Sequence, residues 1–295
     1  MNTRSGFICM VGRPNVGKST LLNKLIGQKV AIVSDKPQTT RNRIQGIYTC
    51  EEGQAIFIDT PGIHKPKHLL GEYMVNVTAR TLREVDLIFY VVDATSRPGP
   101  GEEYIVQQLM DIETPIFLIL NKIDLVSKSQ IKEAAVLYNT KMSFVEKIPV
   151  SAATGQNLPN LKNKIFEYLP EGPFYYPDDE FTDQPERFIV AETIREKALS
   201  LTREEVPHCL AVEIDEFKEK SENMIYIRAT IFTERESQKG IVIGRNGTLL
   251  RQIGELARKD IEKLLGTRVY LDLWVKVKND WRNNEIQLRR LGYDR

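Results

Sequence analysis

The sequence has few cysteines, no long apolar run and almost no excess of charge of either sign. Cys9, Cys50 and Cys209 are far apart and form no C-x-x-C pair, which argues against a disulfide scaffold or a zinc site and fits a reducing compartment. No apolar run approaches the ~18 residues of a membrane-spanning helix, and no signal peptide is visible. The net charge of +1 gives no chain-wide field that would point to a polyanionic partner. We therefore expect a soluble globular chain of one or two domains.

The most informative stretch runs from Gly12 to Ser19 and reads GRPNVGKS, which matches the P-loop pattern G-x-x-x-x-G-K-S/T. An apolar run at residues 6–11 precedes it and an amphipathic segment at residues 19–27 follows it, so the pattern predicts strand, loop and helix. Glycines let backbone N–H groups surround a polyphosphate at a helix N-terminus. Lys18 can then reach the β- and γ-phosphates, and the Ser19 hydroxyl can bind Mg²⁺.

Strand patterns alternate with helical patterns as far as residue 169. We expect strands at 44–50, 54–59, 86–93, 115–120 and 145–150, and helices at 70–84, 102–110, 130–141 and 158–169. The first two of these strands form a hairpin, and a polar loop precedes them at residues 28–43. A second loop, which contains His64 and His68, follows the hairpin. The alternation predicts an α/β fold with a doubly wound, mostly parallel sheet and ligands at the carboxyl ends of its strands.

Asn121-Lys122-Ile123-Asp124 follows one of the predicted strands and decides between ATP and GTP. A carboxylate placed like Asp124 can accept hydrogen bonds from guanine N1–H and the 2-amino group, whereas adenine would leave it unpaired at a cost of a few kcal/mol. The Lys122 stem can lie over the base, and Asn121 can tie this loop to the P-loop. Ser151-Ala152 can present a backbone N–H to guanine O6.

Asp59-Thr60-Pro61-Gly62 ends another predicted strand. Asp59 can hold Mg²⁺ through water, and the Gly62 N–H can meet the γ-phosphate. Thr39 or Thr40 can close over Mg²⁺ when a triphosphate is bound, and the sequence does not decide between them.

The order of these motifs resembles that of the translation-factor-related class of GTPases across the whole first domain. The expected GTP-binding residues are Gly12, Arg13, Pro14, Asn15, Val16, Gly17, Lys18, Ser19, Thr20, Asp59, Thr60, Pro61, Gly62, Asn121, Lys122, Ile123, Asp124, Ser151, Ala152 and Ala153. The expected Mg²⁺ site uses Ser19, Asp59 and Thr39 or Thr40, and hydrolysis is expected to involve Lys18, Asn15, Gly62 and Ile63.

Ile63 departs from the pattern of many small GTPases, which carry a water-orienting glutamine after the D-x-x-G glycine. A hydrocarbon side chain neither donates nor accepts a hydrogen bond, so we expect slow intrinsic hydrolysis with charge stabilisation from another group or a partner. Asn15 resembles the P-loop asparagine of GTPases that use K⁺ near the β/γ bridge. A hydrogen bond within the loop is the alternative role for Asn15.

The remaining chain predicts a linker and a second, α+β domain. Residues 170–186 are rich in proline, aromatic and acidic residues, so we expect a GTPase domain at 1–169, a linker at 170–186 and a second domain at 187–295. Its expected elements are helices at 187–201 and 249–265, strands at 209–217, 224–232 and 269–278, a charged turn at 218–222 and a short final helix that ends near residue 292. In the last strand, alternate residues from Val269 to Val277 share one face, and those from Tyr270 to Lys278 share the other.

Residues 239–247 read KGIVIGRNG and lie between the strand pair and the long helix. This arrangement resembles that of the G-x-x-G loop in a type II KH domain. Such a loop lets backbone approach nucleic-acid phosphates while an apolar groove takes unstacked bases. The expected RNA contacts are Lys239, Ile241, Ile243, Gly244, Arg245, Asn246 and Gly247. Residues 181–238 contain 8 basic and 13 acidic residues, whereas residues 239–295 contain 13 basic and 7 acidic ones. This asymmetry favours single-stranded RNA as the partner, and the alternative is docking on a protein or an anionic membrane.

A P-loop GTPase with Ile63 after its D-x-x-G motif, fused to a KH domain that contains LWVKVK at residues 273–278, closely resembles the Era family over essentially the whole chain. The resemblance implies a ribosome-assembly GTPase that binds the 3′ end of 16S rRNA on the small (30S) subunit. It also implies a cytoplasmic protein with loose association at the inner face of the cell membrane. We expect a monomer with Mg²⁺ as cofactor, and GTP and GDP as ligands.

Overall fold

The computed structural model describes residues 3–36, 39–63, 66 and 68–293. The expected loop at His64 and part of the polar loop, residues 37–38, lie outside these residues. Contacts divide the chain into two compact units. The first consists of Met1–Ala31, Thr40–Pro66 and Met74–Asp183, and the second of Ile32–Thr39, Lys67–Tyr73 and Gln184–Arg295. The division into domains at 1–169, 170–186 and 187–295 stays a prediction.

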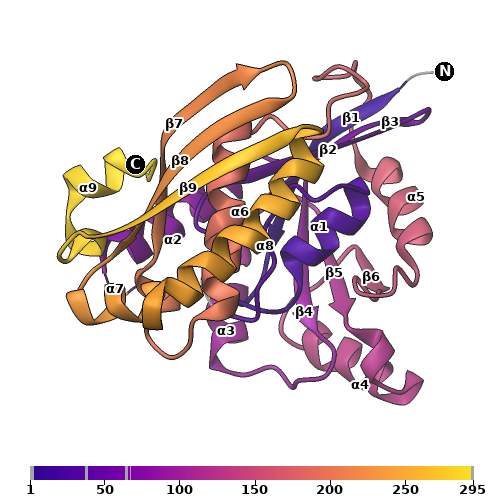
Figure 1. The fold of residues 1–295 in the computed structure, drawn as a ribbon. Coiled ribbons are helices and arrows are strands. Elements are labelled where there is room, and N and C mark those ends of the chain that lie inside the picture. Colours follow the sequence, from indigo (N-terminus) through magenta and orange to yellow (C-terminus); the bar gives the residue numbers. More distant parts are fainter. Residues whose placement is uncertain (1–2, 37–38, 64–65, 67, 294–295) are drawn as a thin grey trace. The chain divides into compact units, whose positions relative to one another are not determined.

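The first unit contains a six-stranded sheet with strand order β2-β3-β1-β4-β5-β6 (Figure 1). Its strands are β1 (Arg4–Val11), β2 (Ile44–Cys50), β3 (Gly53–Asp59), β4 (Leu87–Asp93), β5 (Ile116–Asn121) and β6 (Glu146–Pro149). Only β2 runs antiparallel to its neighbour, because it forms a hairpin with β3. The predicted doubly wound, mostly parallel sheet is therefore confirmed.

Helices cover both faces of this sheet. They are α1 (Lys18–Ile26), α2 (Leu69–Thr81), α3 (Pro100–Leu109), α4 (Lys128–Asn139) and α5 (Leu158–Tyr168), with a short 3₁₀ turn η1 (Ile123–Leu125) after β5. Of α2, the residues up to Tyr73 belong to the second unit and those from Met74 to the first. Ile105 of α3 and Tyr138 of α4 join the apolar cluster on one face. On the other face, α1 and α5 pack against β3. Each expected element of this unit is present with its ends shifted by at most three residues.

The second unit packs helices against a three-stranded sheet with order β7-β8-β9. Its elements are α6 (Glu186–Leu201), η2 (Pro207–Cys209), β7 (Ala211–Ser221), β8 (Met224–Thr233), α7 (Glu236–Ile243), η3 (Arg245–Gly247), α8 (Thr248–Leu265), β9 (Arg268–Val277), η4 (Trp281–Asn283) and α9 (Glu285–Arg290). β7 pairs antiparallel with β8, and β9 pairs parallel with β8. This topology confirms the type II KH arrangement. Within the described residues, no helix is long and apolar enough to cross a membrane.

One local expectation for the second unit is wrong, and one helix was not predicted. Residues 218–221 continue β7 instead of forming a charged turn, because β7 is an edge strand whose charged side chains can face solvent. Residues 241–243 end the helix α7; its first turn is stabilised by the Gln238 side chain, which accepts a hydrogen bond from the Arg235 N–H. The predicted alternation along β9 is confirmed, since Val269 and Val275 are buried and Tyr270 and Trp274 are exposed.

Candidate functional site

The P-loop residues connect β1 to α1 and wrap around a buried lysine. Lys18 Nζ donates hydrogen bonds to the carbonyl oxygens of Gly12 and Arg13, each at 3.1 Å. Burial lowers the pKa of Lys18, while the charge of Asp59 opposes the shift. Asn15 is exposed and has a left-handed backbone with φ of 65°. The loop therefore holds its lysine and its backbone in a compact form that can close around an anion.

Two hydroxyl groups meet the buried carboxylate of Asp59. Ser19 Oγ donates to Asp59 Oδ2 at 2.6 Å, Thr40 Oγ1 donates to the same oxygen at 3.1 Å, and the two hydroxyl oxygens lie 3.1 Å apart. Asp59 Oδ1 is buried and has no hydrogen-bond partner in the described part of the chain. Burial raises the pKa of Asp59, against the effect of Lys18 and of the two hydroxyl hydrogen bonds.

These oxygen donors suit Mg²⁺, which prefers one or two carboxylates with phosphate and water as further ligands. The described residues contain no group of three or more His, Cys, Asp or Glu residues that could hold a metal. The Thr39 hydroxyl instead donates to the Lys36 carbonyl at 2.6 Å. The geometry therefore brings Thr40, and not Thr39, to Ser19 and Asp59.

Asn121, the last residue of β5, links three loops. Its Nδ2 donates to the Val16 carbonyl oxygen at 2.8 Å, and its Oδ1 accepts from the Ala152 N–H at 2.9 Å. A Cβ on Gly17 would lie 2.3 Å from Asn121 Nδ2, so only glycine leaves room for this bridge. The P-loop, the N-K-x-D loop and the turn at residues 151–153 are thus held in one arrangement.

Lys122 is oriented by an acid that the sequence analysis did not include. Lys122 Nζ lies 2.6 Å from Asp93 Oδ2, and Asp93 ends β4 directly beside Asn121 in the sheet register. An acid at the carboxyl end of the strand next to β5 was the signal that could have found it. Asp124 lies in η1 and is exposed, where it can meet a base.

In the turn after β6, the backbone N–H groups that were expected to face guanine O6 already donate hydrogen bonds within the chain. The Ser151 N–H donates to the Gln156 carbonyl, and the Ala152 N–H donates to Asn121. A hydrogen bond from either N–H to guanine O6 would therefore be shared with an intramolecular acceptor. Ala153, by contrast, is exposed.

Gly62 and Ile63 have different surroundings. A Cβ on Gly62 would lie 2.9 Å from the Pro14 nitrogen, so the D-x-x-G turn lies directly against the P-loop. Ile63 is only 6% exposed and belongs to the apolar cluster of the first unit. Its side chain packs in the core and presents no polar group to a water.

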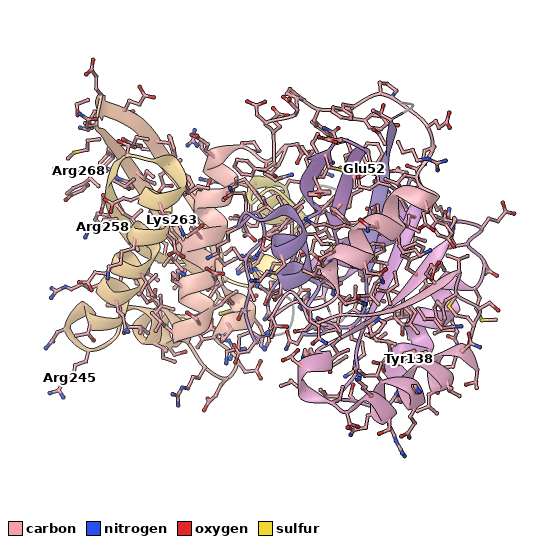
Figure 2. The ribbon with its side chains drawn as sticks, turned by 90° about the vertical axis from the view of Figure 1, so that its right-hand side faces the viewer. Glu52, Tyr138, Arg245, Arg258, Lys263 and Arg268 are labelled. Atoms are coloured by element: carbon pink, nitrogen blue, oxygen red, sulfur yellow. The ribbon has the colours of Figure 1, made fainter. Side chains whose placement is uncertain are left out.

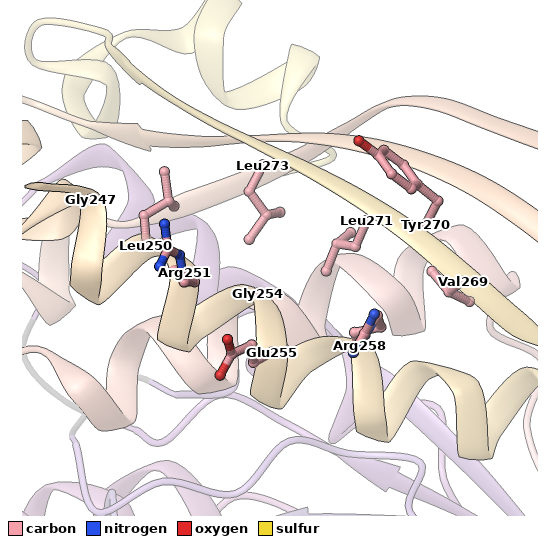
Figure 3. Close-up of a pocket in the computed structure, with 10 residues that line it drawn as sticks. All are labelled: Gly247, Leu250, Arg251, Gly254, Glu255, Arg258, Val269, Tyr270, Leu271 and Leu273. Carbon is pink, nitrogen blue, oxygen red and sulfur yellow. The ribbon is translucent and has the colours of Figure 1, made fainter.

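The second unit contains a groove of about 500 Å³ between α8 and β9 (Figure 3). Leu250, Arg251, Gly254, Glu255 and Arg258 line it from α8, with Gly247 at its end, and Val269, Tyr270, Leu271 and Leu273 line it from β9. Apolar walls beside two arginines suit unstacked bases with a phosphate backbone.

Of the residues expected to contact RNA, only Gly247 lines this groove. Lys239, Ile241 and Ile243 lie on α7, and Gly244, Arg245 and Asn246 form the turn before α8. Arg251 and Arg258 were not among the predicted contacts, although residues at i, i+4, i+7 and i+11 from Gly247 share one helix face. Figure 2 labels the basic residues Arg245, Arg258, Lys263 and Arg268, all of which are exposed.

Two protein-family models match the chain. Residues 7–122 match a family described as "50S ribosome-binding GTPase", and residues 205–282 match the KH domain family. The first match covers the P-loop, the Asp59–Gly62 turn and the start of the N-K-x-D loop, and the second covers the groove.

Full-length relatives match as well. The chain is 59% identical to GTPase Era of Heliobacterium modesticaldum over 291 residues, which are 99% of this chain and 97% of that protein. It is 42% identical to Era in a crystal structure with MgGDPNP and nucleotides 1506–1542 of 16S ribosomal RNA, with a TM-score of 0.96, 99% of this chain and 100% of that chain covered. A tyrosine-to-alanine variant of Aquifex aeolicus Era bound to GDP·AlF4⁻ gives the same identity, coverage and TM-score.

Proposed function

The chain belongs to the Era family of GTPases, and from that premise we propose that it couples GTP hydrolysis to the binding of ribosomal RNA during assembly of the small subunit. The observation that carries the proposal is the presence, in one chain, of the Asn121-bridged nucleotide site and of the groove beside the G-x-x-G turn.

In the proposed GTP site, this chain's residues bind and orient the triphosphate. Lys18 would leave the carbonyl oxygens of Gly12 and Arg13 for the phosphates, and Ser19, Thr40 and Asp59 would hold Mg²⁺. Mg²⁺ supplies charge neutralisation between the β- and γ-phosphates. The unpartnered Asp59 Oδ1 supports this assignment, because a buried carboxylate oxygen needs a compensating cation or donor.

Guanine would be recognised by Asp124 and covered by the stem of Lys122. The ion pair with Asp93 supports this role, because it fixes the ammonium end of Lys122 and so limits where the stem can lie. We propose that the buried Ile63 has no part in orienting water, and that turnover is slow until a partner or another group adds charge stabilisation.

We also propose that a K⁺ ion binds beside Asn15, near the phosphates. The exposed, left-handed Asn15 is compatible with a side chain that turns toward the phosphates. Single-turnover hydrolysis faster in KCl than in NaCl of equal ionic strength supports it, and equal rates in both salts remove it.

The groove would bind a single RNA strand, and the 3′ end of 16S rRNA is the proposed sequence because a relative was crystallised with nucleotides from it. The test is titration of the full chain with single-stranded oligoribonucleotides at several salt concentrations. Gly244→Asp and Gly247→Asp should abolish binding, because each puts a negative charge where phosphate approaches. Gly266→Asp is the matched control for Gly247→Asp, since Gly266 has the same left-handed backbone and open space but lies at the other end of α8.

The second candidate function, docking of the basic half on an anionic membrane or on a protein, is tested in the same series. Liposomes with anionic lipid replace the RNA. Membrane binding that survives both glycine substitutions, together with absent RNA binding, would favour the second function. We also propose a cytoplasmic, monomeric protein; sedimentation measures its mass.

We further propose that GTP and GDP change the affinity for RNA. Thr40 would close on Mg²⁺ only when the triphosphate is bound, and the preceding segment belongs to the second unit. Reciprocity then requires that RNA change the affinity for nucleotide by the same factor. Equal RNA affinity in the two states would exclude the switch without excluding RNA binding.

A further inference from the structure

Arg13 of the P-loop points its side chain at an acid of helix α3. Arg13 Nη1 lies 2.9 Å from Glu102 Oε1 and 3.1 Å from Glu102 Oε2. The Glu102 side chain is only 3% exposed, whereas that of Arg13 is 44% exposed. A Cβ on Gly101 would lie 3.1 Å from Arg13 Cδ, so the missing side chain there lets Arg13 run close over the first turn of α3.

Glu102 is itself fixed in place. Its Oε2 accepts a hydrogen bond from the Gly99 N–H at 3.0 Å, which closes the first turn of α3. Behind it, α3 packs into the core through Ile105 and Val106. A carboxylate held on a packed helix is a rigid anchor, and the guanidinium is the group that it holds.

The anchored stretch of the P-loop is the part that meets the Gly62 turn. The carbonyl oxygens of Gly12 and Arg13 both accept from Lys18 Nζ, and the Pro14 nitrogen lies against Gly62. In the proposed GTP site, Gly62 faces the γ-phosphate. A shift of the Arg13 backbone would therefore alter the γ-phosphate side of the site before it altered the remainder.

We propose that Glu102 is a positioning residue of the GTPase site, which holds Arg13 so that the P-loop and the Gly62 turn keep the spacing that a γ-phosphate requires. The inference rests on the proposed GTP site. In this role Glu102 acts through Arg13 and contacts neither nucleotide nor water. Because GDP lacks the γ-phosphate that Gly62 would face, loss of Glu102 should weaken the binding of GTP more than that of GDP.

The test compares Glu102→Gln, Arg13→Gln and the double variant in the full chain. We expect affinity for a GTP analogue and the single-turnover hydrolysis rate to fall about tenfold in each variant, with GDP affinity changed less than about threefold. The double variant should be no worse than the worse single variant, because both changes break one contact. Glu103→Gln is the matched control, since Glu103 is the next residue on α3, its side chain is 58% exposed, and it pairs with Lys141 instead of Arg13.

Under either role, Arg13→Gln should lower the melting temperature more than Glu102→Gln, because it leaves a buried carboxylate without its cation. A purely structural role predicts that the losses of GTP affinity follow the same order. If losses of GTP affinity follow that order of stability, or if GTP and GDP affinities fall together, the positioning role is overturned. Additive losses in the double variant also overturn it. Failure of the wild-type chain to bind or hydrolyse GTP would instead remove the proposed function, so the two failures are distinguishable.

Discussion

At the scale of single residues, two glycines at the ends of α1 share a left-handed backbone but differ in their surroundings. Gly17, with φ of 98°, would place a Cβ 2.3 Å from Asn121 Nδ2, whereas Gly27, with φ of 81°, has nothing within 4 Å of such a Cβ. Gly17→Ala should therefore displace Asn121 and reduce affinity for GTP and GDP by tenfold or more, since about 1.4 kcal/mol is one factor of ten.

Gly27→Ala is the control for backbone strain alone. It should cost about 1 kcal/mol of stability and leave nucleotide affinity unchanged. Calorimetric titration with GDP and thermal unfolding measure both effects. Equal losses of GDP affinity in the two variants would contradict the role given to the Asn121 bridge.

Asp93 gives the site a predictable dependence on acid. Burial alone would raise the pKa of Asp93, but hydrogen bonds from Lys122 and Thr95 and the Lys122 charge lower it below its usual value. The ion pair therefore stabilises the fold above pH ~4, by about 1 kcal/mol. This contribution is lost as pH falls through the lowered pKa, because protonated Asp93 no longer attracts Lys122.

Urea unfolding at pH 6 and pH 3 gives the free energy of unfolding of wild type and of Asp93→Asn. Wild type should be more stable than Asp93→Asn by the larger amount at pH 6 and by a smaller amount at pH 3. The Asp111→Asn variant, which changes an exposed acid, should have the stability of wild type at both pH values. A difference that grows in acid would show that the sign is wrong.

The residue scale also shows how far sequence patterns reach. Motif order predicted Ser19, Asp59, Asn121 and Asp124, because each follows a strand or opens a helix at the same sheet edge. It could not choose between Thr39 and Thr40, since that choice depends on whether the hydroxyl meets Lys36 or Asp59.

At the scale of elements, α8 combines a buried face with a groove-lining face. Ile253, Ala257 and Ile261 are fully buried, and Arg251 and Arg258 lie at the groove. The 3.6-residue period predicted the buried face. It did not predict α7 or the length of β7, because a short helix and a charged edge strand carry weak periodic signals.

Ile253→Ala tests what holds α8 in place. Shortening a fully buried isoleucine side chain from four carbons to one should cost about 3 kcal/mol. Leu256→Ala, at 36% exposure on the same helix, should cost under ~1 kcal/mol. Hydrogen exchange of α8 amides is the suitable measurement, because a chain of two units need not unfold in a single step. Similar loss of protection in both variants would contradict the assigned core.

At the scale of the whole molecule, the chain crosses between units directly before Thr40, a residue of the proposed Mg²⁺ site. Residues 32–39 belong to the second unit and residue 40 to the first. Within the second unit, Ile32 joins the apolar core, Glu196 Oε1 accepts from the Val33 N–H, and Arg195 donates to the Thr39 carbonyl. No sequence pattern gives these contacts, because the partners are more than 150 residues apart.

One peptide bond therefore joins Thr39, whose carbonyl accepts a hydrogen bond from Arg195 of α6, to Thr40, whose hydroxyl lies in the proposed Mg²⁺ site. If the nucleotide acts on RNA affinity through this bond, Glu196→Gln should weaken the hydrogen bond that the Val33 N–H donates to residue 196. The RNA affinities of the GTP-analogue and GDP states should then become more similar. A coupling of 1–3 kcal/mol is typical, so we expect the ratio of the two affinities to fall by about fivefold. Glu186→Gln is the control, because Glu186 makes the same change of charge at an exposed position at the start of the same helix. Fluorescence anisotropy of a labelled oligoribonucleotide measures the six affinities, two for each of the three proteins. A ratio that is unchanged in Glu196→Gln while RNA still binds would place the coupling elsewhere in the chain.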